Sequence, residues 1–209
     1  DFPIVSGNAS LSNQTNERCI KPTPAIGGVG VIKDTLKACN YKLKNEEEFI
    51  FVIGATKGHL ENTLYANVVE KHFGGLVPEV NFKEELLNSK FIREAILNGF
   101  VSACAAVLDA GIIGKLCKMS LASNQNIGFA LNVEEKTEGL SLIQYLFAED
   151  SGRFVLTVPK EFGAKFIEMA IDQGVLYNHI GFTIKDEIGI NSRFKISVEE
   201  LRKLNKVNA

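Results

Sequence analysis

The sequence has no tryptophan and few histidines, methionines or cysteines. Its 209 residues include no Trp, two Met, three His and four Cys. The cysteines, at positions 19, 39, 104 and 117, show no Cys-x-x-Cys spacing, so a zinc site or disulfide framework is poorly supported and buried free thiols are expected. None of the histidines has a nucleophile pattern beside it, and we assign no catalytic residue in this chain.

The sequence also lacks a surplus of either charge. The 23 Lys and Arg against 25 Asp and Glu give a formal net charge of -2, so there is no sustained positive field to attract nucleic acid or an anionic membrane. No apolar run approaches the roughly 20 residues that span a bilayer. We therefore expect a cytoplasmic protein with no nucleic-acid or membrane partner. A hydrophobic content of 45% is enough for an ordinary packed core.

The opening stretch, residues 3–10 followed by 22–30, runs from apolar strand residues directly into small and polar ones. Gly7 permits close backbone approach, Asn8 offers an uncharged oxygen to a hard metal ion, and Ser10 carries a hydroxyl. Alternation in an extended segment places Asn8 and Ser10 on one face. The residues alone fit an Asn/Ser turn between two strands equally well, and we expect a buried strand over 26–32.

A second glycine-bounded segment follows a strand expected over 49–53. The loop Gly54–Gly58 and a helix over 62–73 form a common arrangement for presenting backbone N–H groups to an anion. The loop is not a Walker A sequence, so this signal has low specificity. In the alternative interpretation, Lys57 and His59 are simply solvated loop residues.

Hydrophobic periodicity indicates strands alternating with helices in a mixed order. Further strands are expected over 129–133, 153–158 and 180–185, and helices over 80–98, 112–122, 140–147, 161–173 and 198–205. The fold class is α+β (mixed α/β), with a mixed sheet of about four or five strands covered by helices. A charged connector over 42–48 separates two expected domains, residues 1–44 and 45–209.

Five motifs occur in the order and spacing of one known family. They resemble the family patterns SGNxSxxN, PTPxIG, GxTxGxxxxxxY, the DGG turn and LFGExxxR, and lie at Val5–Asn13, Pro22–Gly27, Gly54–Tyr65, Asp109–Gly111 and Leu146–Arg153. Together they cover most of the chain. The sequence resembles the large, ATP-dependent subunit of phosphoribosylformylglycinamidine synthase, the amidoligase of the fourth step of purine synthesis.

The resemblance implies a fold, a reaction and three ligand contacts. Residues 45–209 would have the fold of the C-terminal domain of the aminoimidazole ribonucleotide synthetase superfamily, and residues 1–44 would be the tail of the preceding ATP-binding domain. In the family, the formyl amide oxygen of formylglycinamide ribonucleotide accepts a phosphoryl group from ATP, and ammonia from a glutaminase then displaces phosphate. By position, Gly7 would contact ATP, Asn8 would ligate Mg2+ and Ser10 would bind the substrate phosphate.

The same resemblance implies that this chain is incomplete. It opens with Asp rather than Met inside an apolar strand pattern, and the catalytic histidines and carboxylate ligands of the family would lie upstream of Asp1. We therefore expect an isolated chain to be inactive. Its expected partners are the missing N-terminal portion of the synthase and a glutaminase subunit or domain.

Two departures from the family pattern bear on ligand binding. Ala105-Ala106-Val107-Leu108 stands where the family has His-Asp-x-Ser, which removes metal and phosphate ligands, so this half-site should not hold magnesium. Asp150-Ser151-Gly152 also replaces the usual residues between Glu149 and Arg153. We expect Glu149 and Arg153 to cap or pair structurally.

Two alternatives remain. The chain can be a non-catalytic structural or assembly module with a decayed nucleotide site, which the apolar residues at 105–108 favour for residues 45–209. It can also be another superfamily member, such as a thiamine monophosphate kinase, a selenophosphate synthetase or a hydrogenase maturation protein. The SGNxS and PTPxIG motifs argue against that second alternative.

Overall fold

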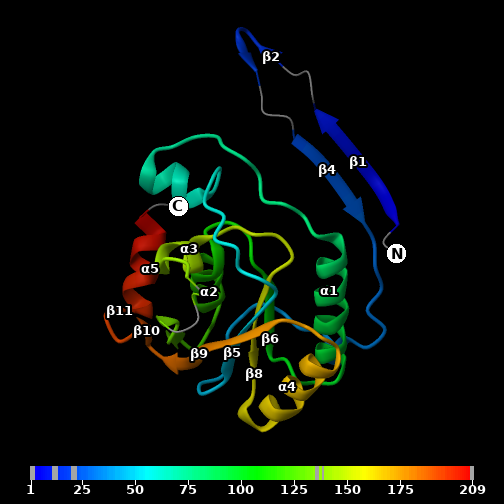
Figure 1. Ribbon diagram of the computed structural model, residues 1–209, viewed down its shortest axis with the longest axis vertical. Coiled ribbons are helices and arrows are strands. Elements are labelled where there is room, and N and C mark those ends of the chain that lie inside the picture. Colours follow the sequence, from blue (N-terminus) through cyan, green and yellow to red (C-terminus); the bar gives the residue numbers. More distant parts are fainter. Residues whose placement is uncertain (1–2, 11–13, 20–22, 135–136, 138, 208–209) are drawn as a thin grey trace. The chain divides into compact units, whose positions relative to one another are not determined.

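The computed structural model describes residues 3–10, 14–19, 23–134, 137 and 139–207 (Figure 1). The chain forms two compact units, Asp1–Ala38 and Cys39–Ala209. Residues just before the expected boundary at 44/45 pack with the second unit: Asn40 pairs with Ala103, and Leu43 is only 2% exposed in its core. The expected assignment of residues 1–44 to a preceding domain stays a prediction.

The first unit is an open antiparallel ribbon. Its main strands are β1 (Ile4–Ser10) and β4 (Thr23–Gly28); a smaller ribbon pairs β2 (Gln14–Thr15) with β3 (Arg18–Cys19), and a 3-10 turn, η1, spans Thr35–Lys37. The prediction of a buried strand over 26–32 is wrong. Strand β4 ends at Gly28, and Ile26 is 66% exposed because the two strands have no second layer within this unit.

The second unit is built on a seven-stranded mixed sheet in the order β11-β10-β7-β9-β5-β8-β6. Its strands are β5 (Phe49–Ile53), β6 (Ala103–Ala106), β7 (Ile127–Leu131), β8 (Phe154–Val158), β9 (Tyr177–Lys185), β10 (Glu187–Ile190) and β11 (Phe194–Ser197). Strands β10 and β7 pair in parallel, and the other neighbours pair antiparallel. The predicted α+β class and mixed sheet are confirmed.

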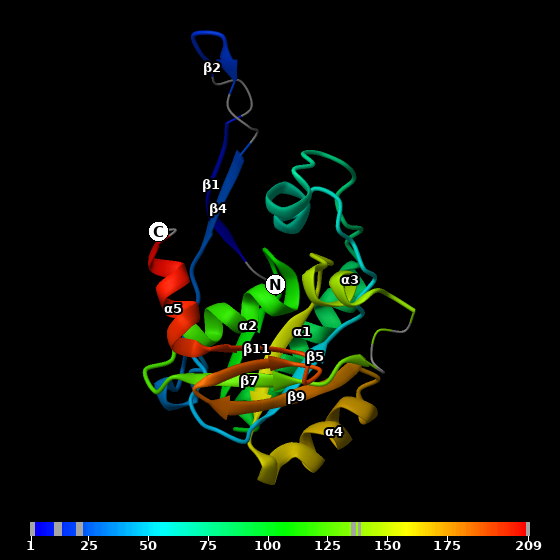
Figure 2. The same cartoon turned by 90° about the vertical axis from the view of Figure 1, so that its left-hand side faces the viewer.

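Helices cover both faces of this sheet. They are α1 (Phe82–Leu97), α2 (Gly111–Leu121), α3 (Leu142–Phe147), α4 (Gly163–Asp172) and α5 (Val198–Val207), with a 3-10 turn, η4, at Lys160–Phe162. Residues of α1 and α4 form one apolar core, and residues of α2, α3 and α5 form the other. Figure 2 shows α4 on the opposite side of the sheet from α2 and α5. No described helix is long and apolar enough to cross a membrane.

Strand β5, which lies in the interior of the sheet between β9 and β8, shows why its sequence is a continuous apolar run. Ile50 and Val52 belong to the core beneath α2 and α3, whereas Phe51 and Ile53 belong to the core beneath α1 and α4. All four side chains are at most 1% exposed. Because successive side chains of a strand point to opposite faces, a strand with helices on both sides must be apolar at every position.

The sheet has more strands than the four or five predicted. Strand β6 was missed because its Ala-Cys-Ala-Ala sequence has little of the β-branched and aromatic character that marks strands. Strands β10 and β11 were missed because each has only four residues. They are joined by a tight turn in which Asn191 and Ser192 both have left-handed φ angles, 50° and 55°.

The helix predicted over 62–73 forms only in part, because residues 64–70 are helical and the flanking residues are not. Its regular part is a short π-helix, η2 (Ala66–Glu70), which ends where Lys71 adopts a left-handed φ of 56°. The α1 helix forms as predicted and is capped by Asn81, whose side chain accepts from the amides of residues 83 and 84. However, Leu86 is 55% and Leu87 38% exposed, so fewer of the apolar residues of α1 face the core than its sequence pattern predicts.

Candidate functional site

The three residues expected to contact ligands all lie on β1 of the first unit. Gly7 pairs with Ile26, Asn8 with Ala25 and Ser10 with Thr23 across the β1–β4 ladder. Gly7 and Asn8 are exposed. The alternative interpretation, an Asn/Ser turn between two strands, is therefore wrong at these positions, which belong to strand β1. The last residue of the SGNxSxxN motif, Asn13, lies outside the described residues.

Glycine at position 7 is not required by the fold of this unit. A Cβ atom added there would meet only the carbonyl oxygen of Ala25, at 3.8 Å, which is an ordinary van der Waals contact. The residue lies in a regular strand and does not have the left-handed φ that favours glycine. At Gly27 on β4 the fit is tighter, with a Cβ 3.3 Å from that of Ser6. Position 7 thus offers bare backbone on an exposed strand.

In the second unit, the glycine-bounded loop after β5 does present backbone N–H groups to an anion, and that anion belongs to the chain itself. The Asp150 carboxylate accepts from the amides of Lys57 at 2.9 Å, Gly58 at 3.1 Å and His59 at 3.3 Å. Asp150 is 4% exposed. A carboxylate buried among backbone donors leaves no vacancy for a phosphate at this loop.

Glu149, next to Asp150, connects two helical segments to the polar cluster around the loop after β5, which we call the polar junction. Its Oε1 accepts from the amide of Ala110, just before α2, at 2.8 Å and from the amide of Leu64, just before η2, at 2.9 Å. Ala110 has a left-handed φ of 60° and no side-chain cap of its own. Glu149 therefore caps α2 from a distance, and the structural role predicted for it agrees with these contacts.

Arg153 is buried beneath the loop, with an exposed fraction of 1%. Its guanidinium donates to the Ala148 carbonyl at 2.6 Å, to Thr56 Oγ1 at 3.0 Å and to the Asp150 carbonyl at 3.3 Å. Burial lowers the pKa of Arg153, and the Asp150 carboxylate, 3.8 Å from Nη2, opposes that shift. The side chain is fully engaged within the chain and is not free to bind a ligand.

The fold brings two of the motifs together. Residues 106–109 and 149–153 line one cavity of about 380 Å3. In place of metal or phosphate ligands it presents the apolar Val107, 3% exposed, and Leu108, 59% exposed. No three His, Cys, Asp or Glu side chains within the described part of the chain are grouped so as to hold a metal ion. Asp109 and Glu149 at this cavity would repel a phosphate, and the lining Arg153 is already bonded within the chain.

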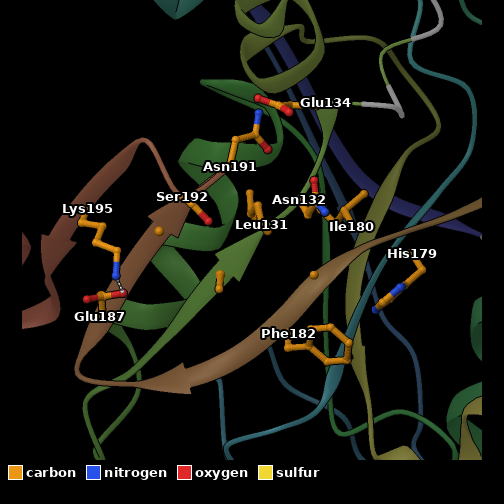
Figure 3. Close-up of a pocket in the computed structure, with 13 residues that line it drawn as sticks. Leu131, Asn132, Glu134, His179, Ile180, Phe182, Glu187, Asn191, Ser192 and Lys195 are labelled. Atoms are coloured by element: carbon orange, nitrogen blue, oxygen red, sulfur yellow. Dashed lines mark hydrogen bonds and ion pairs between the residues drawn. The ribbon is translucent and has the colours of Figure 1, made fainter.

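A second hollow, of about 510 Å3, lies over β7, β9 and β10 (Figure 3). Its floor includes Gly181 and Gly189, and its charged groups pair locally: Glu187 with Lys195 at 3.0 Å, and Glu134 with Arg193 at 2.9 Å. None of the predicted site residues lines it. This hollow could not be predicted because strand β10 was not predicted. The glycines on neighbouring strands were the one indication in the sequence, since glycine in a strand often marks a close approach by a ligand or another backbone.

Comparison with known proteins places this fold in a family. Residues 46–190, more than half of the chain, match the family described as AIR synthase related protein, C-terminal domain. Among curated proteins, the chain is 33% identical over 203 residues to the phosphoribosylformylglycinamidine synthase subunit PurL of Pelagibacter ubique and 35% identical over 202 residues to that of Azorhizobium caulinodans. Each alignment covers 97% of this chain but 27% of the relative, so the chain spans about a quarter of their length.

Solved structures share the fold. The PurL protein of Thermotoga maritima complexed with FGAR superposes with a TM-score of 0.67 over 86% of this chain and 31% of that protein, at 11% identity. The same protein complexed with ATP gives a TM-score of 0.61 over 86% of this chain and 28% of that protein, at 10% identity. The chain therefore belongs to the family of AIR synthase related proteins, whose C-terminal domain it carries at residues 46–190.

Proposed function

We propose that this chain is part of an ATP-dependent phosphoribosylformylglycinamidine synthase, an amidoligase. The enzyme would convert formylglycinamide ribonucleotide, ATP and ammonia into formylglycinamidine ribonucleotide, ADP and phosphate. The observation that carries the proposal is the match of 97% of the chain, at 33% and 35% identity, to relatives named as a subunit of that synthase. The five motifs of the sequence support the same assignment.

Strand β1 is the part of the chain that we assign to ligand contact. Gly7 would let ATP approach the backbone, and the supporting observation is that nothing in the first unit needs a glycine there. Ser10 would bind the substrate phosphate. Both residues belong to the β1–β4 ladder, and Gly7 is exposed, as a contact with a ligand requires.

Asn8 would supply one oxygen ligand to Mg2+. Its amide is exposed and uncharged, which fits a hard cation that keeps most of its ligands from water and phosphate oxygens. When bound, Mg2+ would offset the charge on the phosphates. Further protein ligands would come from the N-terminal portion of the synthase.

The domain assignment follows from the same proposal. Residues 1–44 would complete an ATP-binding domain formed by a preceding segment, and residues 45–209 would be the C-terminal domain that supports it. The partners would be the N-terminal portion of the synthase and a glutaminase that supplies ammonia. The protein would act in the cytoplasm, and this chain alone would be inactive.

A structural role for the second unit is a narrower, compatible proposal. The anion-binding loop is occupied by Asp150, Glu149 caps two helical segments, and Arg153 is buried and fully bonded. These contacts use up the groups that would otherwise be available for a nucleotide. We therefore assign catalysis-related contacts to β1 alone and a supporting role to residues 45–209.

Gly7→Ala in the full-length synthase tests the site assignment. The added methyl group fits the ribbon but would occupy the space proposed for ATP, so KM for ATP should rise about tenfold, the effect of about 1.4 kcal/mol of lost binding, with the melting temperature unchanged. Gly30→Ala is the matched control, because a Cβ at position 30 meets nothing within 4 Å. Equal KM values for ATP in the two variants would show that Gly7 does not contact ATP.

A further inference from the structure

A third hollow in the second unit lies beside the sheet edge formed by β6. It has a volume of about 520 Å3 and lies between α2, β6 and the segment containing Tyr41. Part of its wall is apolar and comes from Ala105, Leu121 and Ala122. The two charged side chains that line it are Lys115 and Lys118, and none of its described lining residues is acidic.

The two lysines lie on one face of α2, three residues apart, where side chains of a helix are neighbours. The acidic group that approaches them is Asp109, whose Oδ2 is 3.9 Å from the Lys118 ammonium. Those two side chains are 71% and 55% exposed, so this contact is worth little in water. The hollow therefore keeps an excess of positive charge.

The protonation behaviour of Lys115 agrees with this charge balance. Partial burial lowers the pKa of Lys115, and the neighbouring Lys118 lowers it further, while Asp109 acts in the opposite direction. An unfavourable positive environment of this kind would be relieved by a bound anion. A doubly charged anion would balance both lysines at once.

We propose that this hollow binds a small organic phosphate. Lys115 and Lys118 would hold the phosphate group as two point charges, and the attached organic group would lie on the apolar wall of Ala105, Leu121 and Ala122. The site shares no residue with β1 and does not depend on the proposed synthase activity. Its ligand class follows from two positive charges placed beside an apolar surface.

The test is a titration of the full 209-residue chain with phenyl phosphate at constant ionic strength, followed by amide NMR shifts. Binding should have a dissociation constant of about 1 mM and perturb the amides around residues 104–105 and 115–122. Lys115→Gln and Lys118→Gln should each weaken binding about tenfold. Lys115→Arg, which keeps the positive charge, should retain most of the affinity for phenyl phosphate.

Lys165→Gln on α4 is the matched control, because it removes the same charge from an exposed position that does not line the hollow. It should leave the dissociation constant unchanged. Absence of shifts around α2, or equal weakening by all three Gln variants, would overturn the site. Inorganic phosphate binding as tightly as phenyl phosphate would overturn the role of the apolar wall. Unchanged circular dichroism of each variant shows that it has folded.

Discussion

Asp150 holds together the polar junction of the second unit. It accepts three backbone amides from residues 57–59, and its Oδ2 lies 3.8 Å from the buried guanidinium of Arg153. An ionised carboxylate can be buried at this position because donors and a positive charge surround it. The loop is thereby fixed by the chain itself.

Replacing Asp150 with Asn should therefore be costly. The change removes the charge that compensates Arg153, and breaking a buried pair in this way typically costs about 3 to 5 kcal/mol. Chemical denaturation of the purified chain would measure the free energy of unfolding. Asp109→Asn is the control: its side chain is 71% exposed, and its loss should cost less than about 1 kcal/mol. Equal effects would show that the junction contributes little.

The cysteines give a prediction that depends on pH. Buried free thiols were expected, but Cys19 is exposed and the others are half-buried. Burial raises the pKa of Cys104 from 9.0 to about 12 and that of Cys117 to about 11. At pH 8 the Cys104 thiolate fraction should fall about a thousandfold below that of the unfolded chain. Alkylation followed by mass spectrometry should label Cys19 first, and rapid native labelling of Cys104 would contradict this.

The same shift has a consequence for stability. Folding favours the protonated thiol of Cys104, so its contribution is present below pH 9 and is lost as the pH rises toward 12. At the residue scale, the sequence could indicate structural roles for Glu149 and Arg153. It could not show that Asp150 fills the loop, because residues 57 and 150 are brought together only by the tertiary fold.

At the scale of elements, close strand packing depends on particular glycines. A Cβ at Gly128 on β7 would lie 1.9 Å from the Glu187 carbonyl oxygen and 3.0 Å from Val198. A backbone oxygen in a paired strand cannot move away without disrupting the pairing of β7 with β10. Gly128 is thus what allows β10 and β11 to extend the sheet.

Gly128→Ala should destabilise the second unit by several kcal/mol, on the order of 3, because overpacking forces a shift of the backbone. Thermal unfolding measured by circular dichroism would report it as a lower melting temperature. Gly189→Ala, on the adjacent β10, is a close control. A Cβ there would meet atoms only at 3.8 Å, so its effect should be small. Similar melting temperatures for the two variants would mean that β7 and β10 do not pair as described.

Elements with a strong pattern could be predicted from the sequence, and those without one could not. Strand β5 and helix α1 carry long apolar runs or clear periodicity, and both form. The Ala-rich β6 and the four-residue β10 and β11 have neither, and they are specified by pairing with strands distant in sequence. The helix expected over 62–73 is shorter than predicted, over residues 64–70, and its apolar spacing has little to pack against: Val68 and Val69 are 54% and 61% exposed.

At the scale of the whole molecule, the two units differ in whether they have an apolar core of their own. The second unit has two apolar cores on either side of a seven-stranded sheet. The first has a two-stranded ribbon with exposed Ile4, Val5 and Ile26, and such a ribbon is marginal by itself. The proposed function accounts for this difference, because β1 and β4 would be part of a larger domain of the synthase.

The most direct test of this account is the ammonia-dependent activity of the full-length synthase carrying Asn8→Ala. Loss of one electrostatic contact to the reacting groups should lower kcat about a hundredfold. Asn8→Asp, which keeps an oxygen ligand, should retain more activity, and Asn124→Ala, at an exposed position between α2 and β7, should be silent. An Asn8→Ala enzyme with nearly normal turnover would contradict the account, and the supporting role would then extend over the whole chain.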